Sequence, residues 1–303
     1  MNLETELCGI RLANPTVLAS GILGVSRSLL SEVIRNGAGA VTIKSISFEP
    51  REGHKNPTVV AFEGGMMNAV GYSNPGAAAA KDEFAGLKKL GAPVFASVIG
   101  QAPEDFVKVV KTLAGLDFAA IEIPLSCPHT PGFGTLAGQD TPEKTHEIVK
   151  AVVKATKLPV FVKLSPITKN LGEVARAAEK AGASAITAVN TMGPGMVINI
   201  DAKTPVMGFR IGGVSGPALK PVAVRCVYDV YESVKIPIIG TGGVTTGKDA
   251  IEMMMAGAKV VGIGSAVHYR GIDVFRKVCS EMSEWLKANG YSCLDEIRGA
   301  AHG

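Results

Sequence analysis

The chain of 303 residues is poor in aromatic and charged side chains, which make up only 5% and 19% of it. So few aromatics argue against a nucleic-acid reader that stacks bases on aromatic rings. The net charge is only +4, and the Lys and Arg residues form no basic run. This distribution favours an ordinary solvated surface over a patch for nucleic acid or lipid.

Long apolar runs and a leader sequence are also missing. No stretch of about 20 apolar residues occurs, so we expect no membrane-spanning helix and no membrane partner. The N-terminal sequence MNLETELCGIRLANP has no basic segment followed by an apolar one. We therefore expect no signal peptide and a cytoplasmic location. The five cysteines are widely spaced without CxxC or Cys/His patterns, which predicts neither a disulfide framework nor a metal or iron–sulfur site in this chain.

Glycine and apolar residues are abundant, at 36 residues and 47% of the chain, as in a packed α/β protein with many tight turns. Short runs of apolar and β-branched residues predict strands at Pro15–Ser20, Ala40–Ser45, Pro93–Val98, Ala119–Leu125, Pro159–Leu164, Ala185–Asn190, Pro237–Thr241 and Lys259–Ser265. Several are almost continuously apolar, as in a parallel sheet covered on both faces. Amphipathic spacing predicts helices at Ser28–Asn36, Pro103–Ala114, Pro142–Thr156, Leu171–Ala181, Pro217–Val234 and Lys248–Ala256.

The alternation of strands and helices predicts a parallel sheet, and eight repeats favour its closure into a (β/α)8 TIM barrel. The rival fold, an open doubly wound sheet, usually carries a GxGxxG turn after its first strand. The turn here, ASGILGVS, lacks the third glycine. No linker-like segment divides the chain, so we expect residues 1–303 to form one domain.

Glycine-rich turns follow the last two predicted strands, at the end of a barrel where active sites lie. These turns are GTGG at 240–243 and GIGS at 262–265, and GGVSG at 212–216 precedes a helix. Each alone is compatible with a plain tight turn. Together, at adjacent strand ends where barrels commonly bind phosphate, they predict a cofactor that carries a phosphate.

Two lysines and one cysteine are the reactive side chains at the other strand ends. Lys44 and Lys163 stand in apolar strands, where an ammonium group is unfavourable unless it meets an anion or a polar ligand. Cys127 lies between a strand and a segment rich in Gly and Pro, and a thiol there can serve as an acid/base. The other cysteines fit small apolar positions, and His129 is a weaker candidate as a partner of Cys127.

Amide and hydroxyl groups accompany these residues. Asn190 and Thr191 end the sixth predicted strand, and Asn68 lies between the second and third strands. Together they could bind the imide edge of a pyrimidine. A lone Asn beside Gly, as at Asn68, is otherwise typical of a turn.

The sequence resembles the class 1 dihydroorotate dehydrogenases, and among them the catalytic subunit of the NAD-linked type B of bacteria and archaea. The resemblance extends nearly from end to end. It rests on KSISFEPREGHKNPT at 44–58, GGMMNAVGYSNPG at 64–76, SCPH at 126–129, VKLSP at 162–166, VNTMGPGM at 189–196, GGVSGPALKPVAVRCVYDVY at 212–231, IPIIGTGGV at 236–244 and GIGSAV at 262–267. A cysteine base and no N-terminal membrane helix are similar to class 1 and differ from the quinone-linked class 2.

The resemblance implies an FMN-dependent oxidation of (S)-dihydroorotate to orotate in pyrimidine biosynthesis. Cys127 would remove the C5 proton while the C6 hydride passes to flavin N5. The implied FMN-binding residues are Ser20, Lys44, Ser45, Lys163, Val189, Gly216, Gly242, Gly243, Gly264 and Ser265. The implied substrate-binding residues are Lys44, Asn68, Ala69, Val70, Gly71, Tyr72, Asn190 and Thr191.

The resemblance also implies partners. It implies a homodimer and, for the NAD-linked type, a heterotetramer with a separate subunit that carries FAD and a [2Fe–2S] cluster. The electron acceptor stays open between NAD through that subunit, fumarate and another carrier.

The sequence departs from the family pattern at three places. Pro124 stands where the family has an asparagine before the catalytic cysteine, Ile167-Thr168 replaces a common Asn-Val, and Tyr72 replaces a usual leucine. A lost hydrogen bond to a buried group costs about 1–3 kcal/mol, and proline cannot donate in a central strand, so the strand end could be rearranged. Two alternatives therefore stay open. One is a related flavin oxidoreductase acting on another pyrimidine-like ring, similar to the reducing domain of dihydropyrimidine dehydrogenase, and the other is a weakly active flavin-binding paralogue.

Overall fold

Eight parallel strands close into a barrel in the computed structural model, which describes residues 2–126 and 138–303. The strands are β3 (Thr16–Leu18), β4 (Ala40–Thr42), β7 (Val94–Ser97), β8 (Ala120–Pro124), β9 (Val160–Leu164), β10 (Ala185–Ala188), β15 (Ile238–Thr241) and β16 (Val260–Ile263). Around the barrel they follow the order in which they occur in the chain, and β16 pairs with β3 to close it. Every predicted strand is present, so the predicted (β/α)8 barrel is confirmed.

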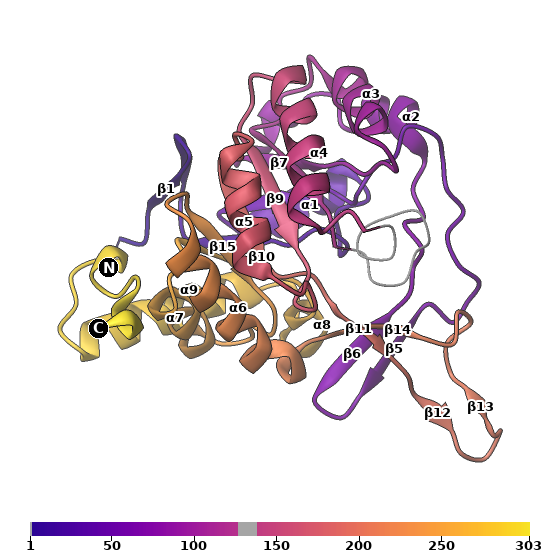
Figure 1. Cartoon of the computed structure of the whole chain (residues 1–303). Helices are drawn as coiled ribbons and strands as arrows, with labels where there is room; N and C mark the ends of the chain where they lie inside the picture. Colours follow the sequence, from indigo (N-terminus) through magenta and orange to yellow (C-terminus); the bar gives the residue numbers. More distant parts are fainter. Residues whose placement is uncertain (1, 127–137) are drawn as a thin grey trace.

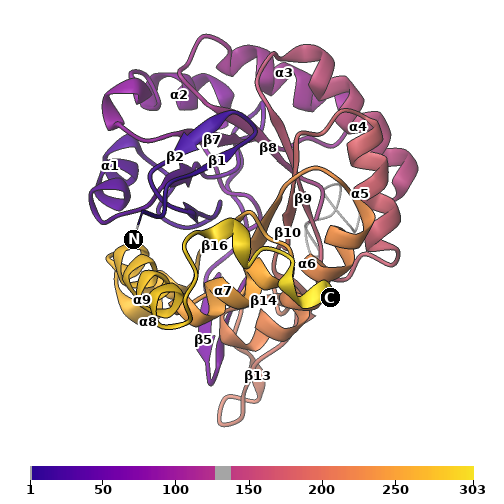
Figure 2. The same cartoon turned by 90° about the vertical axis from the view of Figure 1, so that its left-hand side faces the viewer.

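Helices surround this barrel, as Figure 2 shows end-on. They are α1 (Arg27–Arg35), α2 (Gly76–Glu83), α3 (Pro103–Leu113), α4 (Pro142–Ala155), α5 (Leu171–Lys180), α6 (Lys220–Ser233), α7 (Gly247–Met255), α8 (Ala266–Arg270) and α9 (Val274–Ala288). Short 3-10 turns lie at Leu87–Leu90, Pro217–Leu219, Leu294–Glu296 and Ala300–His302. The helix predicted at Pro217–Val234 is therefore divided, because its first residues form a 3-10 turn and α6 begins at Lys220.

Local sequence signals explain where the helices begin and end. The side chains of Thr141 and Thr246 accept hydrogen bonds from backbone amides of the first turns of α4 and α7. Gly182 and Gly257 follow α5 and α7 with φ of 99° and 118°, a conformation that glycine adopts without strain. These caps fix the lengths of the helices and so the places where the next strands enter the barrel.

The amino-terminal end of the barrel is closed by apolar side chains. A hairpin of β1 (Thr5–Leu7) and β2 (Ile10–Leu12) buries Leu7 and Leu12 against the inward-facing residues of the strands. Among those residues, Phe95 and Phe161 meet edge to face, with their ring centroids 5.2 Å apart. Because this end is filled, a ligand can enter the barrel only from the carboxyl ends of the strands.

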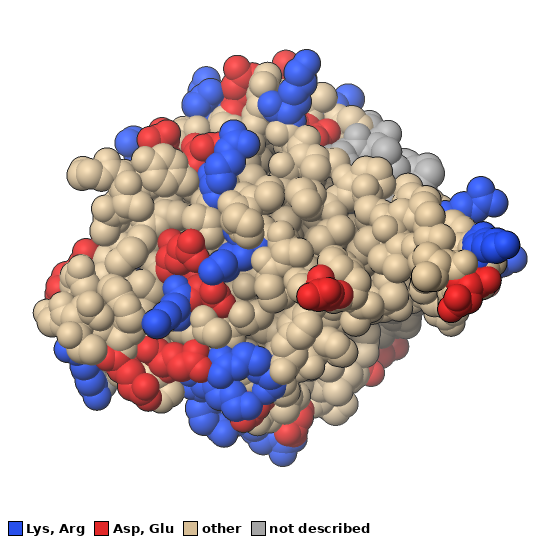
Figure 3. Space-filling view, turned by 90° about the horizontal axis from the view of Figure 1, so that it is seen from below, with Lys and Arg blue, Asp and Glu red and all other residues tan. Residues whose placement is uncertain are grey.

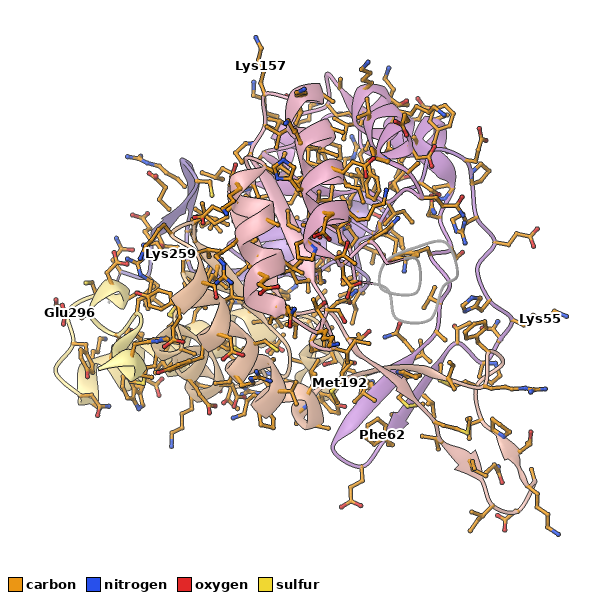
Figure 4. All side chains as sticks on the ribbon, in the orientation of Figure 1. Lys55, Phe62, Lys157, Met192, Lys259 and Glu296 are labelled. Carbon is orange, nitrogen blue, oxygen red and sulfur yellow. The ribbon has the colours of Figure 1, made fainter. Side chains whose placement is uncertain are left out.

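A small antiparallel sheet lies at the opposite end from this hairpin (Figure 1). Its strands, in spatial order, are β11 (Met192–Gly195), β14 (Gly212–Ser215), β6 (Gly65–Asn68) and β5 (Val59–Phe62). A further hairpin of β12 (Ile198–Asn199) and β13 (Thr204–Pro205) projects beside it. The sequence patterns did not predict this sheet, in which Met192 and Phe62 are marked in Figure 4.

The surface carries charges of both signs. Figure 3 shows Lys and Arg side chains mixed with Asp and Glu over one face, around a broad area with few charged residues. Within the described residues, no helix is both long and apolar enough to cross a membrane.

Candidate functional site

A cavity of about 290 Å³ opens at the carboxyl ends of the barrel strands. Every residue that the sequence assigned to the cofactor lines it, from Ser20 after β3 to Ser265 after β16. The small sheet adds a wall, since Val59, Met66 and Ser215 also line the cavity. The fold therefore brings together residues that are far apart in the sequence.

The residues assigned to the substrate line the same cavity, with the exception of Ala69. Ala69 is fully buried against Met67 and Met207. Its amide donates a hydrogen bond to the carbonyl of Thr58, and its carbonyl is hydrogen-bonded to Nδ1 of His54. Its place is thus in the small core beneath the cavity wall.

Lys163 and Lys44 place two cationic side chains on the cavity. Lys163 lies in β9, is only 4% exposed, and its Nζ donates to Oγ of Ser20 over 3.3 Å. Lys44 follows β4, and burial lowers the pKa of its ammonium group below the ordinary value of 10.5. Two cations on one cavity, Lys163 buried and Lys44 half-buried, favour a ligand that is anionic or becomes so.

Glycines after β15 form a backbone cradle at the cavity. Gly242 and Gly243 have φ of 131° and 76°, and a Cβ on Gly243 would lie 2.5 Å from Cβ of Lys220. Their amides, and that of Gly264, donate to no other backbone group of the described residues. They are therefore available to phosphate oxygens. The amides at the start of α7 are already used, because those of Thr245 and Thr246 just before the helix donate to Asp249 and that of Gly247 donates to Glu281.

One buried hydroxyl group at the cavity lacks a hydrogen-bond partner within the described residues. Thr241 at the end of β15 is 8% exposed, and its Oγ1 has no hydrogen bond within the described part of the chain. A buried hydroxyl without a partner is unfavourable by about 1–3 kcal/mol. A bound ring with polar edge atoms would satisfy it, so this cavity fits a flavin with a phosphate tail.

The side-chain amide of Asn190 is held against Ser126, the last described residue before the segment 127–137. Its Nδ2 donates to Oγ of Ser126 over 2.9 Å, and its Oδ1 accepts from the amide of Thr191 over 2.8 Å. Ser126 directly precedes Cys127, which lies outside the described residues. Asn68, at the end of β6, lines the cavity from the small sheet.

Comparison with known proteins agrees with this arrangement. The profile of the family described as "Dihydroorotate dehydrogenase" matches residues 2–286. The chain belongs to the dihydroorotate dehydrogenase family. Enzymes of this family are flavin-dependent oxidoreductases.

Archaeal relatives are similar over their whole length. A protein of Methanothermobacter thermautotrophicus is 46% identical over 99% of this chain and 98% of its own, and one of Pyrococcus abyssi is 45% identical over 99% of both. One of Methanocaldococcus jannaschii is 44% identical over 99% of this chain and 98% of its own. All three are named "Dihydroorotate dehydrogenase B (NAD(+)), catalytic subunit". These names favour neither of the two alternative activities.

Pro124, the departure from the dihydroorotate dehydrogenase pattern, does not interrupt its strand. β8 continues through Pro124, which pairs with Lys163 and lines the cavity. The amide of Leu125 donates to the carbonyl of Lys163 in β9. Because successive backbone amides of a strand point to opposite sides, the nitrogen of Pro124 faces β7. The residue pairs between β7 and β8 end before Pro124, at Ser97 and Glu122. β8 therefore keeps its pairing with β9, and the described strand end shows no rearrangement. The ladder with β7 ends with the bond from the amide of Val98 to the carbonyl of Glu122, because Pro124 has no N–H to donate to the carbonyl of Val98.

Tyr72 also lines the cavity, with a left-handed φ of 57° that is rare for a bulky residue. Its ring packs against Ile99, and its carbonyl accepts a hydrogen bond of 2.8 Å from Nδ2 of Asn74. A tyrosine in place of leucine thus adds a polar ring to the wall of the cavity.

Glu122 is a residue that the sequence reasoning missed. It lies in β8, two residues before Pro124, and is 4% exposed. The sequence contains a signal that could have identified it. Glu122 is the one carboxylate in the apolar run AIEIPL, and by the alternation of a strand it shares a face with Pro124.

Asp249 braces the glycine cradle from behind. It accepts hydrogen bonds from Nζ of Lys220 over 2.7 Å and from the amides of Thr245 and Thr246. Burial opposes its ionisation, but these bonds outweigh burial and lower the pKa of Asp249 to about 2 from an ordinary 3.8. A carboxylate with a lowered pKa stabilises the fold above its unfolded pKa and ceases to do so as the pH falls through the folded one.

We therefore expect a pH-dependent difference between the wild type and Asp249→Asn. The wild type should gain about 2 kcal/mol of unfolding free energy from this ionisation near neutral pH, and lose it between about pH 4 and pH 2. Denaturant unfolding at a series of pH values measures this. In Lys220→Met the pH-dependent part of the unfolding free energy should be smaller, because Asp249 has lost the ammonium group that lowers its pKa. A wild-type advantage that is the same at every pH would contradict the assignment.

Proposed function

We propose that the chain oxidises (S)-dihydroorotate to orotate with FMN as its cofactor, and that residues 1–303 act as a single FMN-binding domain. The observation that carries this proposal is the joint placement, on one cavity, of the buried Lys163, the half-buried Lys44, a glycine cradle with free amides and the side-chain amides of Asn68 and Asn190. Family membership supports the reaction. The cradle and the orphan hydroxyl of Thr241 support the cofactor.

In this proposal FMN, when bound, supplies the acceptor for the hydride that leaves C6 of dihydroorotate. Cys127 takes the proton from C5 as the general base, so the substrate loses one hydride and one proton in total. Ser126, which precedes the base in the sequence, accepts a hydrogen bond of 2.9 Å from Asn190, and this bond supports a fixed position for the Asn190 amide. General-base catalysis of this kind typically contributes about 10²–10⁴ in rate.

The remaining assigned residues bind and orient. Lys163 would stabilise negative charge on the reduced ring, and the amides of Gly242, Gly243 and Gly264 would hold the phosphate. Lys44 would pair with the carboxylate of dihydroorotate, while Asn68, Asn190 and Thr191 would bind its imide edge.

The first test is the visible spectrum of the purified chain. We expect a yellow protein whose flavin absorption bleaches when (S)-dihydroorotate is added without oxygen. A yellow protein that does not bleach would retain the flavin but reject the substrate. A chain that stays colourless even after FMN is added back would reject the cofactor.

Binding of the substrate should depend on the charge of Lys44. Because burial lowers its pKa below 10.5, Lys44 loses its proton at a lower pH than an exposed lysine. Above that pKa the dissociation constant for orotate should rise by about tenfold per pH unit. Titration of the flavin spectrum with orotate at a series of pH values measures this. In Lys44→Arg the dissociation constant for orotate should stay constant over the same pH range, because arginine keeps its charge. If the dissociation constant still rose, the titrating group would be another residue.

We further propose that the electrons pass to NAD through a separate subunit carrying FAD and a [2Fe–2S] cluster, in a heterotetramer built on a homodimer. The names of the archaeal relatives support a catalytic subunit of an NAD-linked enzyme. Among residues 2–126 and 138–303, no group of three or more His, Cys, Asp or Glu side chains could hold a metal ion.

The acceptor can be tested on the isolated chain after its flavin has been reduced by dihydroorotate. NAD should reoxidise it only slowly until the partner subunit is added. Fast reoxidation by fumarate alone would reject the NAD-linked assignment. Sedimentation of the chain alone tests the homodimer.

A further inference from the structure

Glu122 is a carboxylate buried inside the barrel, just below the cavity. It does not line the cavity, yet both of its oxygens are engaged by residues from other strands. Its Oε1 accepts a hydrogen bond of 3.0 Å from Oγ of Ser20, and its Oε2 accepts one of 3.0 Å from Oγ1 of Thr187. A carboxylate buried to this degree is strongly unfavourable unless hydrogen bonds and an opposite charge offset it.

The opposite charge is that of Lys163. Nζ of Lys163 donates to Oγ of Ser20, whose own proton goes to Glu122, so the serine links the ammonium to the carboxylate. Apart from Asp249, Glu122 and Lys163 are the buried charged side chains of the described residues. Thr187 completes the arrangement, since it pairs in register with Lys163 and donates to Glu122.

This chain of hydrogen bonds has a direction. Because Glu122 accepts the proton of Ser20, the serine can offer a ligand only a lone pair, whereas Lys163 keeps two protons for an acceptor on the ligand. Ser20 and Lys163 both line the cavity, so Glu122 acts on a ligand only through them. Its charge also offsets one of the two lysine charges beside the ligand.

We propose that Glu122 is a positioning residue that fixes Lys163 through Ser20 and, by its negative charge, lowers the reduction potential of the bound flavin. The inference rests on the proposed flavin site. Without Glu122, two lysine charges would stand beside the ring with no buried carboxylate to offset them. Reduction, which adds negative charge to the ring, would then be easier.

The test is the midpoint potential of the flavin in Glu122→Gln, measured against reference dyes. This change keeps the size of the side chain and removes its charge. Since Glu122 does not touch the cavity, FMN should stay bound. The equilibrium constant for two-electron reduction should rise by on the order of tenfold, which corresponds to about 30 mV. The matched control is Thr187→Val, which removes a hydrogen bond to Glu122 and keeps its charge. It should shift the equilibrium constant much less.

An unchanged potential in Glu122→Gln, or an equal shift in Thr187→Val, would overturn the proposal. If Glu122→Gln does not retain FMN, the pairing is tested without cofactor by denaturant unfolding of Glu122→Gln, Lys163→Met and the double variant. The double variant should be less destabilised than the sum of the two single variants, because each single change leaves one buried charge without its counterpart. Additive effects would overturn the pairing. This cycle needs no flavin, so it separates failure of the inference from failure of the proposed function.

Discussion

Replacing Cys127 by serine is expected to slow reduction of the bound flavin by dihydroorotate by about 10²–10⁴-fold, the usual contribution of a general base. A free thiol has a pKa of about 8.5 and is partly ionised near neutral pH, whereas a serine hydroxyl is not. The proton at C5 would therefore lack an acceptor of suitable strength. Rapid mixing without oxygen, followed by the visible absorption of the flavin, measures the rate directly.

Binding of FMN should survive this change, because the residues assigned to the cofactor lie on other strand ends. The matched control is Cys293→Ser, which changes an exposed cysteine before a 3-10 turn remote from the cavity lining. Its reduction rate should equal that of the wild type. If Cys127→Ser were reduced as fast as Cys293→Ser, Cys127 would have no part in the proton transfer.

The barrel could be predicted from the sequence because each strand is a local pattern. Runs such as PVFVKL are apolar on both faces, and each is followed by a turn and an amphipathic helix, so strand and helix can be identified without knowledge of contacts. Parallel topology then places every strand end on one side. This rule alone located Lys44, Lys163 and the glycine turns at a common cavity.

The small sheet could not be predicted as a whole, because two of its strands, β11 and β14, are not local strand patterns. β11 has the sequence MGPG and β14 has GGVS, which are typical of turns, and β14 pairs with β6 more than 140 residues earlier in the chain. The contact between Glu122, Ser20 and Thr187 likewise joins three strands that only barrel closure brings together. The composition of a strand shows that a carboxylate is buried, but not which groups compensate its charge.

Replacing Pro124 by asparagine is expected to tighten the binding of dihydroorotate by about one to two decades, since a buried hydrogen bond regained is worth about 1–3 kcal/mol. Pro124 lines the cavity beside Lys163, and an asparagine there would present an amide to the ligand. The backbone should tolerate the change. The pairs of β8 with β7 end at Glu122, and the bond from Leu125 to Lys163 does not involve residue 124.

Pro124→Ala separates the gain of an amide from the loss of the proline ring, because alanine removes the ring without adding a polar group. Titration of the flavin spectrum with orotate, together with the KM for dihydroorotate, should show tighter binding in Pro124→Asn. In Pro124→Ala the affinity should equal that of the wild type. Equal gains in both variants would mean that the ring merely obstructs the cavity. If asparagine weakened binding instead, the hydrogen bonds to the substrate would already be complete in this chain. Tyr72, which lines the same cavity where leucine is usual, would then be the first residue to replace.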